Sequence, residues 1–138
     1  MHYLLDACAL IAICNNEPGV GKVLDLIRQA RTGDIQLSMS IVQLLEVYYD
    51  RIYVAGENDA SLVVKSILAE PITIIESVSL SVMYEAGRFK TFYSMSLADS
   101  IAAATARNIS ATLVTKDGEM REAEEAGEFL ALWIKDEE

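Results

Sequence analysis

Four acidic residues are spaced along the chain so that, if the fold brought them together, they could bind one metal ion. They are Asp6, Glu46, Asp99 and Asp117. Hard divalent cations such as Mg²⁺ and Mn²⁺ take carboxylate oxygens as ligands, and such ions promote the hydrolysis of phosphodiester bonds. The residue types therefore indicate a metal site for phosphodiester chemistry, on the condition that the fold places these side chains side by side.

Each of these acids also has a simpler explanation. Asp6 and Asp117 could cap the helices that follow them, and Asp99 could be the acid of a capping box opened by Ser96. Glu46 borders an apolar helix face, a position where a glutamate is more often solvated than functional. The simpler explanation is favoured for any one residue alone, whereas the four together favour a shared site.

The stretch from Ser96 to Asp117 shows how two of the acids would be positioned. Ser96 is a good N-cap, and the alanine-rich run that ends at Ala106 predicts a helix. The apolar run 111–114 has the length and composition of a buried strand, and it stops just before Asp117. Asp99 is therefore expected at the start of a helix and Asp117 directly after a strand.

The rest of the chain continues this alternation of short apolar runs and helical patterns. Strands are predicted at 2–5, 35–38, 72–75, 111–114 and 129–134. Helices are predicted at 7–14, 20–31, 40–54, 60–69, 77–88, 96–106 and 119–126, with a break at 56–59, a loop at 88–93 and Gln43 in the capping-box position of Ser40. Such alternation predicts a parallel sheet covered on both faces, which binds ligands beyond the carboxyl ends of its strands.

Composition limits the class of protein. A chain of 138 residues with 52% hydrophobic residues is expected to form one domain, residues 1–138. The apolar run 7–14 is too short to span a bilayer, and Asp6 interrupts any signal peptide, so a cytoplasmic protein without a membrane segment is expected. Cys8 and Cys14 are predicted to be buried thiols, because they have no second pair with which to form a disulfide framework or a zinc site.

The formal net charge of −10 argues against broad nonspecific binding of nucleic acid, which usually depends on a surplus of Lys and Arg. A local cationic rim around a metal-neutralised site remains compatible with that charge, because a bound ion dominates the local field. Arg88 and Lys90, which are mixed with aromatic residues, and Lys116, beside Asp117, are the candidates for phosphate contacts. A solvated loop is an equally good explanation for 88–93.

The acids lie in motifs that resemble a known family in their order along the chain. The motifs are Leu5-Asp6-Ala7-Cys8-Ala9-Leu10, Ser40 and Glu46 on one helix, Ser96-Leu97-Ala98-Asp99-Ser100-Ile101-Ala102-Ala103-Ala104-Thr105-Ala106, and Leu113-Val114-Thr115-Lys116-Asp117. Together they resemble the PIN-domain ribonucleases, especially the VapC-type toxins of toxin–antitoxin pairs. The resemblance implies a three-layer α/β/α sandwich with a five-stranded parallel sheet. It also implies that Asp6, Glu46, Asp99 and Asp117 surround Mg²⁺ or Mn²⁺, with Thr115 supporting the site by hydrogen bonding and Glu119 as a possible further acid.

Two positions depart from the family pattern. The family usually has Ser or Thr where Cys8 stands, and often Thr where Gln43 stands. Because a thiol is a weak hydrogen-bond donor, Cys8 is expected to support Asp6 less firmly than a hydroxyl would.

The function that follows from the resemblance is that of a metal-dependent endoribonuclease, the toxin of a pair, held inactive by a small antitoxin that occludes the acidic groove. The resemblance also favours a homodimer, for which Tyr48, Tyr49 and Tyr53 on one predicted helix could form a face. Two alternatives remain open. One is a catalytically inactive PIN-like module that binds a protein partner, and the other is a nuclease that cleaves DNA rather than RNA.

Overall fold

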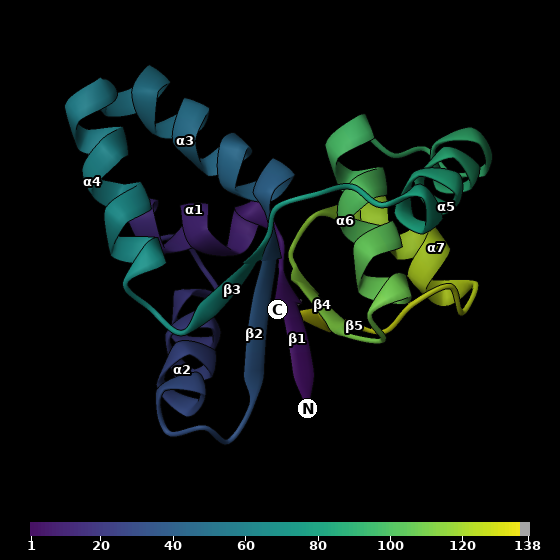
Figure 1. The fold of residues 1–138 in the computed structure, drawn as a ribbon, viewed down its shortest axis with the longest axis horizontal. Coiled ribbons are helices and arrows are strands. Elements are labelled where there is room, and N and C mark those ends of the chain that lie inside the picture. The colour runs from purple at the N-terminus through teal and green to yellow at the C-terminus, as the bar shows by residue number, and fades with distance from the viewer. Residues whose placement is uncertain (136–138) are drawn as a thin grey trace.

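A computed structural model describes residues 1–135 of the chain as one sheet with helices on both sides (Figure 1). The strands are β1 (His2–Leu5), β2 (Gln36–Ser40), β3 (Ile72–Ile75), β4 (Thr112–Thr115) and β5 (Ala131–Trp133). The helices are α1 (Ala7–Asn15), α2 (Val20–Arg31), α3 (Ile41–Ala55), α4 (Glu57–Leu68), α5 (Leu80–Phe92), α6 (Leu97–Asn108) and α7 (Arg121–Glu125), with a 3₁₀ turn η1 (Gly118–Met120).

All the strand pairs are parallel, and the strand order is β3-β2-β1-β4-β5. The chain therefore builds one half of the sheet outward from β1, and then crosses over to place β4 on the other side of β1. In the register between β1 and β4, Leu5 lies opposite Val114. The strand order thus reverses between β1 and β4, and the carboxyl ends of these two strands lie side by side at the point where such sheets bind ligands.

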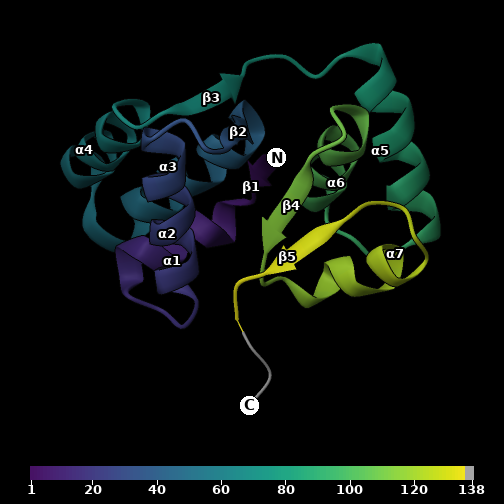
Figure 2. The same cartoon turned by 90° about the horizontal axis from the view of Figure 1, so that it is seen from below.

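The two faces of the sheet have separate hydrophobic cores. Leu5 and Val114 point into the core formed with α1, α2, α3 and α4, whereas their neighbours Leu4 and Leu113 point into the core formed with α5, α6 and α7. This alternation is what the period-two geometry of a strand requires. Figures 1 and 2 show the two groups of helices on opposite sides of the sheet. The predicted three-layer α/β/α sandwich with a five-stranded parallel sheet is confirmed.

Helix α6 can pack closely because its buried face is built from small residues. Four alanines of α6 are completely buried: Ala102, Ala103, Ala104 and Ala106. Small side chains let neighbouring elements approach the helix axis, and α6 packs against α5, β1 and β4. This packing fixes the position of the first turn of α6, which carries Asp99, relative to the ends of β1 and β4.

The loop predicted at 88–93 is wrong, because α5 continues to Phe92. Its apolar stripe, Val82, Ala86 and Phe89, has helical spacing, and Phe89 is fully buried against α6. Phe92, at the end of the same helix, is 71% exposed. The aromatic residues predicted to lie in a loop therefore divide between the buried and the exposed side of α5.

Other predicted boundaries also differ from the structure, since α5 begins at Leu80 rather than at 77 and β5 covers only Ala131–Trp133. Helix α4 begins at Glu57 rather than at Ala60, because the break is confined to Gly56, which has a φ of 93°. Acidic residues in the first turn of α4 favour this earlier start through the helix dipole. Strand β2 extends to Ser40, and the predicted helix 119–126 divides into η1 and the short α7. Within residues 1–135, no helix has the combination of length and apolar character needed to cross a bilayer.

Candidate metal centre

Asp6 and Asp117 come together because they follow adjacent parallel strands. Asp6 comes directly after β1, and Asp117 follows β4 after a single intervening residue. The backbone N–H of Asp6 donates to the carbonyl oxygen of Val114 at 3.0 Å, which extends the β1–β4 ladder to the site itself. Both acids therefore lie at the carboxyl edge of the sheet, at the reversal of strand order.

Thr115 connects these two acids. Its hydroxyl donates to Oδ2 of Asp6 at 2.7 Å and accepts from the backbone N–H of Asp117 at 3.0 Å. Thr115 is completely buried and Asp6 is 2% exposed, so water does not compete for these bonds. The other oxygen of Asp6, Oδ1, accepts from the N–H of Ala7 at 2.8 Å. Asp6 is thus an N-cap of α1 as well as a member of the site.

The first turn of α6 brings in Asp99. Ser96 caps this helix by accepting from the N–H of Asp99 at 3.1 Å, as its position in the sequence predicted. The return bond of the capping box comes from a different residue, because the N–H of Ser96 donates to Oε1 of Glu119 at 2.9 Å. Asp99 is therefore not the capping acid of Ser96.

Three carboxylates converge at this edge. Asp99, Asp117 and Glu119 each present an oxygen atom, and the three oxygens lie within 4.8 Å of one another. Two ligands on opposite sides of an octahedral Mg²⁺ are about 4.2 Å apart, since each lies 2.0–2.1 Å from the ion. The distances between the three oxygens are therefore close to those expected if all three bound one cation. Among residues 1–135, no other group of three His, Cys, Asp or Glu residues converges within this distance.

The electrostatics of Asp99 reflect this crowding. Burial raises the pKa of Asp99 to about 9, with further contributions from a hydrogen bond to Asp117 and from the negative charges of Asp6 and Asp117. At neutral pH the carboxyl group therefore holds a proton unless a cation replaces it. Burial is also the largest cause of the raised pKa of Asp6.

Glu46 reaches the same site from α3. It is half-buried, and its pKa is raised to about 7 by burial first and then by the negative charges of Asp6 and Asp117. Glu46 is not among the three residues whose oxygens lie within 4.8 Å, so it lies beside that cluster and within range of its field. The fold thus brings all four predicted acids to one edge of the sheet.

Cys8 occupies the position beside Asp6. Its Sγ lies 3.5 Å from Oδ2 of Asp6 and 3.5 Å from the hydroxyl of Thr115, and it accepts from the N–H of Lys116 at 3.3 Å. Burial raises the pKa of the thiol to about 12, and the negative charge of Asp6 acts in the same direction. Cys8 is therefore a neutral thiol that fills space around Asp6, and the short hydroxyl bond of Thr115 is the stronger support.

The sequence pattern of the PIN domain matches residues 3–126. This chain belongs to the PIN domain family. No match was found among curated protein sequences.

Solved structures with the PIN fold resemble the chain over nearly all its length. A chain of the VapBC2 complex of Rickettsia felis bound to a promoter DNA fragment is 19% identical, with a TM-score of 0.74, covering 96% of this chain and 98% of that one. A chain of VapBC-1 from Haemophilus influenzae is 14% identical, with a TM-score of 0.72 and coverage of 97% and 98%. VapC20 of Mycobacterium tuberculosis, a toxin that cleaves the sarcin–ricin loop, is 16% identical, with a TM-score of 0.70 and coverage of 88% and 94%.

The three cations predicted to contact phosphate, Arg88, Lys90 and Lys116, differ in the acidic residues that surround them. Arg88 forms ion pairs with Glu85 at 2.6 Å and with Glu128 at 2.7 Å. Lys116 pairs with Glu17 at 2.5 Å. Lys90 lies close enough to the acidic cluster for its charge to lower the pKa of Glu119, although the hydrogen bonds of Glu119 have the larger effect.

One residue of the site was given the wrong role by sequence reasoning. Gln43 does not form a capping box with Ser40. Its completely buried amide instead accepts from the N–H of Ala7 at 3.1 Å and donates to the carbonyl oxygen of Ala98 at 2.9 Å. The signal available in the sequence was its position, one helical turn before Glu46.

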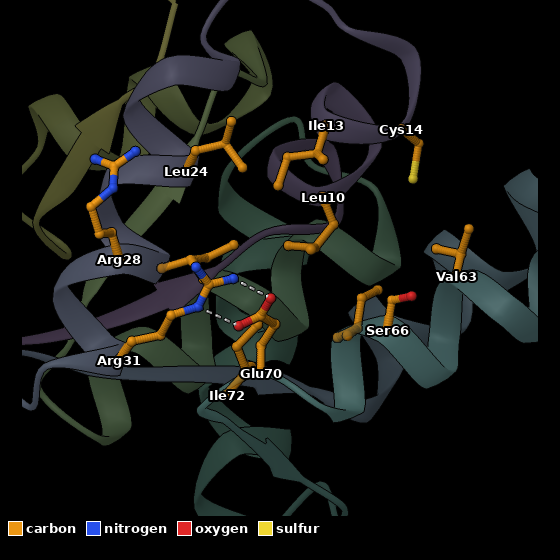
Figure 3. A pocket seen from close by; sticks show the side chains of 12 residues that line it. Leu10, Ile13, Cys14, Leu24, Arg28, Arg31, Val63, Ser66, Glu70 and Ile72 are labelled. Atoms are coloured by element: carbon orange, nitrogen blue, oxygen red, sulfur yellow. Dashed lines mark hydrogen bonds and ion pairs between the residues drawn. The ribbon is translucent and has the colours of Figure 1, made fainter.

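An apolar cavity of the PIN domain is a separate feature. It has a volume of about 330 Å³ and lies among α1, α2, α4 and β3, with apolar side chains such as Leu10, Ile13 and Val63 in its wall. Figure 3 shows the Arg31–Glu70 ion pair at this cavity. None of the residues that line it is one of the clustered acids, so the cavity contributes no ligand to the candidate metal centre.

Proposed function

We propose that this PIN domain is a metal-dependent endoribonuclease that uses Mg²⁺ or Mn²⁺ at the acidic edge of its sheet. The observation that carries the proposal is the convergence of the Asp99, Asp117 and Glu119 oxygens within 4.8 Å, beside Asp6 and Glu46. Membership of the PIN family supports nuclease chemistry at this site.

The residues fit a hard divalent cation. All the donors are carboxylate oxygens, the ligand type that Mg²⁺ and Mn²⁺ prefer. Burial is the largest cause of the raised pKa values of Asp99 and Glu46, and the negative charges of Asp6 and Asp117 raise both further, so a bound cation would offset part of this cost. Asp99, Asp117 and Glu119 would hold the ion, with Asp6 and Glu46 beside them completing the acidic set.

A divalent ion at this position supplies the charge that activates water and stabilises the departing oxygen of a phosphodiester. The residues of the chain supply the geometry. Thr115 fixes the orientation of Asp6, and the N–H of Glu119, donating to Oδ1 of Asp117 at 3.0 Å, fixes that of Asp117. None of the acids needs to act as a nucleophile.

RNA would be held by cations at the rim of the site. The positive charge of Lys90 contributes to the lowered pKa of Glu119, so Lys90 lies near the acids. Lys116 directly precedes Asp117. Both side chains can therefore approach a phosphate that lies beside the acids. Lys116 would exchange its Glu17 partner for the phosphate. The guanidinium of Arg88 is held by two carboxylates, and its contact with RNA would require both ion pairs to open. Phosphate contact is therefore assigned to Lys90 and Lys116.

The biological setting that fits these features is a toxin–antitoxin pair in the cytoplasm. The solved structures of similar fold include complexes of VapBC pairs, and this is the support for an antitoxin whose segment occludes the acidic groove. A homodimer is part of the same proposal. Helix α3 offers an exposed apolar face for it, made by Leu45, Tyr49 and Tyr53.

The proposal is tested by incubating the purified protein with cellular RNA and with single-stranded DNA of matched length, in Mg²⁺ or in EDTA. The expected result is internal cleavage of RNA that requires the ion and is lost in Asp117→Asn. The control is Asp25→Asn, which removes an exposed carboxylate on α2 and should leave cleavage unchanged.

Two results would contradict the proposal. Cleavage of DNA in preference to RNA would change the substrate class. If the wild type cleaves RNA in Mg²⁺ no faster than Asp117→Asn does, the inactive binding module is favoured.

A further inference from the structure

Gln43 is the side chain that joins three of the elements around the acidic edge. It lies on α3, its Oε1 accepts from the N–H of Ala7 at the start of α1, and its Nε2 donates to the carbonyl oxygen of Ala98 in the first turn of α6. A backbone N–H can only donate and a carbonyl can only accept, so these partners determine which end of the amide faces which helix. The amide is completely buried.

Both anchor points of this amide are next to acids of the site. Ala7 follows Asp6, and its N–H is shared between the Asp6 carboxylate at 2.8 Å and the Gln43 amide at 3.1 Å. Ala98 precedes Asp99. Gln43 itself stands one turn before Glu46, so the two residues lie on the same side of α3. One amide thus lies between the backbone positions of three acids.

The contacts of Gln43 are not needed to complete the helices that they join. Ser40 caps α3 by accepting from the N–H of Val42 at 3.2 Å, and Asp6 caps α1. Ser96 caps α6. The amide instead holds the start of α1 and the first turn of α6 at a fixed distance from each other, because it is bonded to both from α3.

We propose that Gln43 is a positioning residue that fixes the spacing of Asp6, Glu46 and Asp99, and thereby makes the site selective for a small divalent cation. The inference rests on the proposed metal-dependent function. Mg²⁺ demands near-ideal octahedral geometry at 2.0–2.1 Å, whereas Ca²⁺ accepts irregular geometry at 2.3–2.6 Å. Loosening the spacing of the acids therefore weakens Mg²⁺ more than it weakens Ca²⁺.

The test replaces the amide with an apolar side chain of similar length, in Gln43→Met. Mn²⁺ binding is measured by the loss of the free-ion paramagnetic resonance signal, and Mg²⁺ and Ca²⁺ affinities follow from competition. Substitutions in the residues that support metal ligands typically cost 10- to 100-fold in affinity. We expect Mg²⁺ affinity to fall by about 10-fold or more, Ca²⁺ affinity to fall less, and the Mg²⁺/Ca²⁺ affinity ratio to decrease.

The matched control is Val47→Ala, which removes buried volume from the same helix one turn further on. Val47→Ala lowers the melting temperature but leaves the Mg²⁺/Ca²⁺ ratio at the wild-type value. Gln43→Leu is the second variant, in case Gln43→Met does not fold. It also removes both hydrogen bonds without adding a charge, so the ratio should again fall.

The outcomes separate this inference from the proposed function. A wild-type protein that binds Mn²⁺, with an unchanged Mg²⁺/Ca²⁺ ratio in the folded Gln43 variants, overturns the positioning role and leaves the metal site intact. An equal loss of selectivity in Val47→Ala also overturns it, because general destabilisation would then be the cause. A wild-type protein that binds no Mn²⁺ removes both the metal site and the role of Gln43.

Discussion

The carboxylate of Asp99 shows how a residue in a capping position becomes available for chemistry. The N–H of Ser96 is bonded by Glu119, so Asp99 turns instead toward Asp117 and shares its field. The cost of this arrangement shows in the pKa of Asp99, which is raised to about 9 by burial first, and then by the hydrogen bond to Asp117 and the neighbouring negative charges. A cation at this position would offset that cost, which links the geometry of Asp99 to the proposed metal binding.

Glu46 gives a prediction for the pH dependence of the metal-free protein. A carboxyl group with a higher pKa in the folded state binds more protons when folded, so rising pH favours unfolding. The pKa of Glu46 rises from 4.5 to about 7, and its contribution to stability is therefore present below pH 4.5 and lost as the pH rises through 7. With EDTA present, Glu46→Gln should lose less stability than wild type between pH 4.5 and 7.

The measurement is urea unfolding at each pH. The control is Glu125→Gln, which alters an exposed glutamate of α7 and should follow the wild-type curve. A Glu46→Gln curve that also coincides with wild type would show that Glu46 is solvated and does not feel the other acids.

Thr115 gives a second prediction at the residue scale. Thr115→Val removes the hydroxyl that donates to Asp6 and leaves a buried carboxylate oxygen without that donor. Stability should fall by about 1–3 kcal/mol, and RNA cleavage by about 10- to 100-fold. Urea unfolding and initial cleavage rates measure the two effects.

Thr105→Val is the control, because the hydroxyl of Thr105 is also buried but donates to the carbonyl oxygen of Ile101 within α6. Cleavage should be unchanged in this variant. If the two valine variants cleave RNA equally well, Thr115 has no role in positioning Asp6.

Among the helices and strands, the features that depend on local sequence patterns could be predicted from the sequence. The short apolar runs of the strands, their alternation with helices and the N-caps Ser40 and Ser96 are local, and the structure confirms each of these predictions. The neighbouring positions of β1 and β4 are a long-range pairing, so no local pattern contained them. For the same reason the sequence assigned Gln43 to a local capping box, whereas its partners lie 36 and 55 residues away.

The end of α5 was missed because its contacts are also long-range. Arg88 pairs with Glu128, and Glu128 accepts in addition from Tyr93 and Arg107. This network joins α5 and α6 to the segment before β5. The sequence therefore predicted a loop for this run of cations and aromatics, because the residues that bond to it are distant in the chain and form no local pattern.

The Arg88 network gives an element-scale prediction. Arg88→Met should destabilise the protein by about 1 kcal/mol, because it breaks a partly buried network of several charges, while RNA cleavage stays close to wild type. Arg28→Met is the control, since it breaks a single exposed pair with Asp25 and should cost less than about 0.5 kcal/mol. Weaker RNA binding in Arg88→Met without a change in stability would instead identify Arg88 as a substrate contact.

For the whole molecule, the net charge of −10 limits how the proposed RNA substrate can be held. With phosphate contact assigned to Lys90 and Lys116, few counterions are released on binding. The slope of log(kcat/KM) against log salt should be about −1.4 for two contacts to single-stranded RNA, and about −0.7 in Lys116→Gln. Kinetics at several salt concentrations and constant Mg²⁺ measure both slopes. A much steeper wild-type slope would reveal a basic surface beyond these two lysines.

The central claim is that the carboxylates form one metal site, and thermal unfolding with and without Mn²⁺ tests it most directly, because it needs no knowledge of the RNA. Mn²⁺ should raise the melting temperature of the wild type by mass action. Without the ion, Asp99→Asn should be at least as stable as wild type, because at neutral pH Asp99 must take up a proton on folding whereas the amide is already neutral, and the variant should respond less to Mn²⁺. If Mn²⁺ stabilises neither protein and Asp99→Asn is the less stable of the two, the acids do not share an ion.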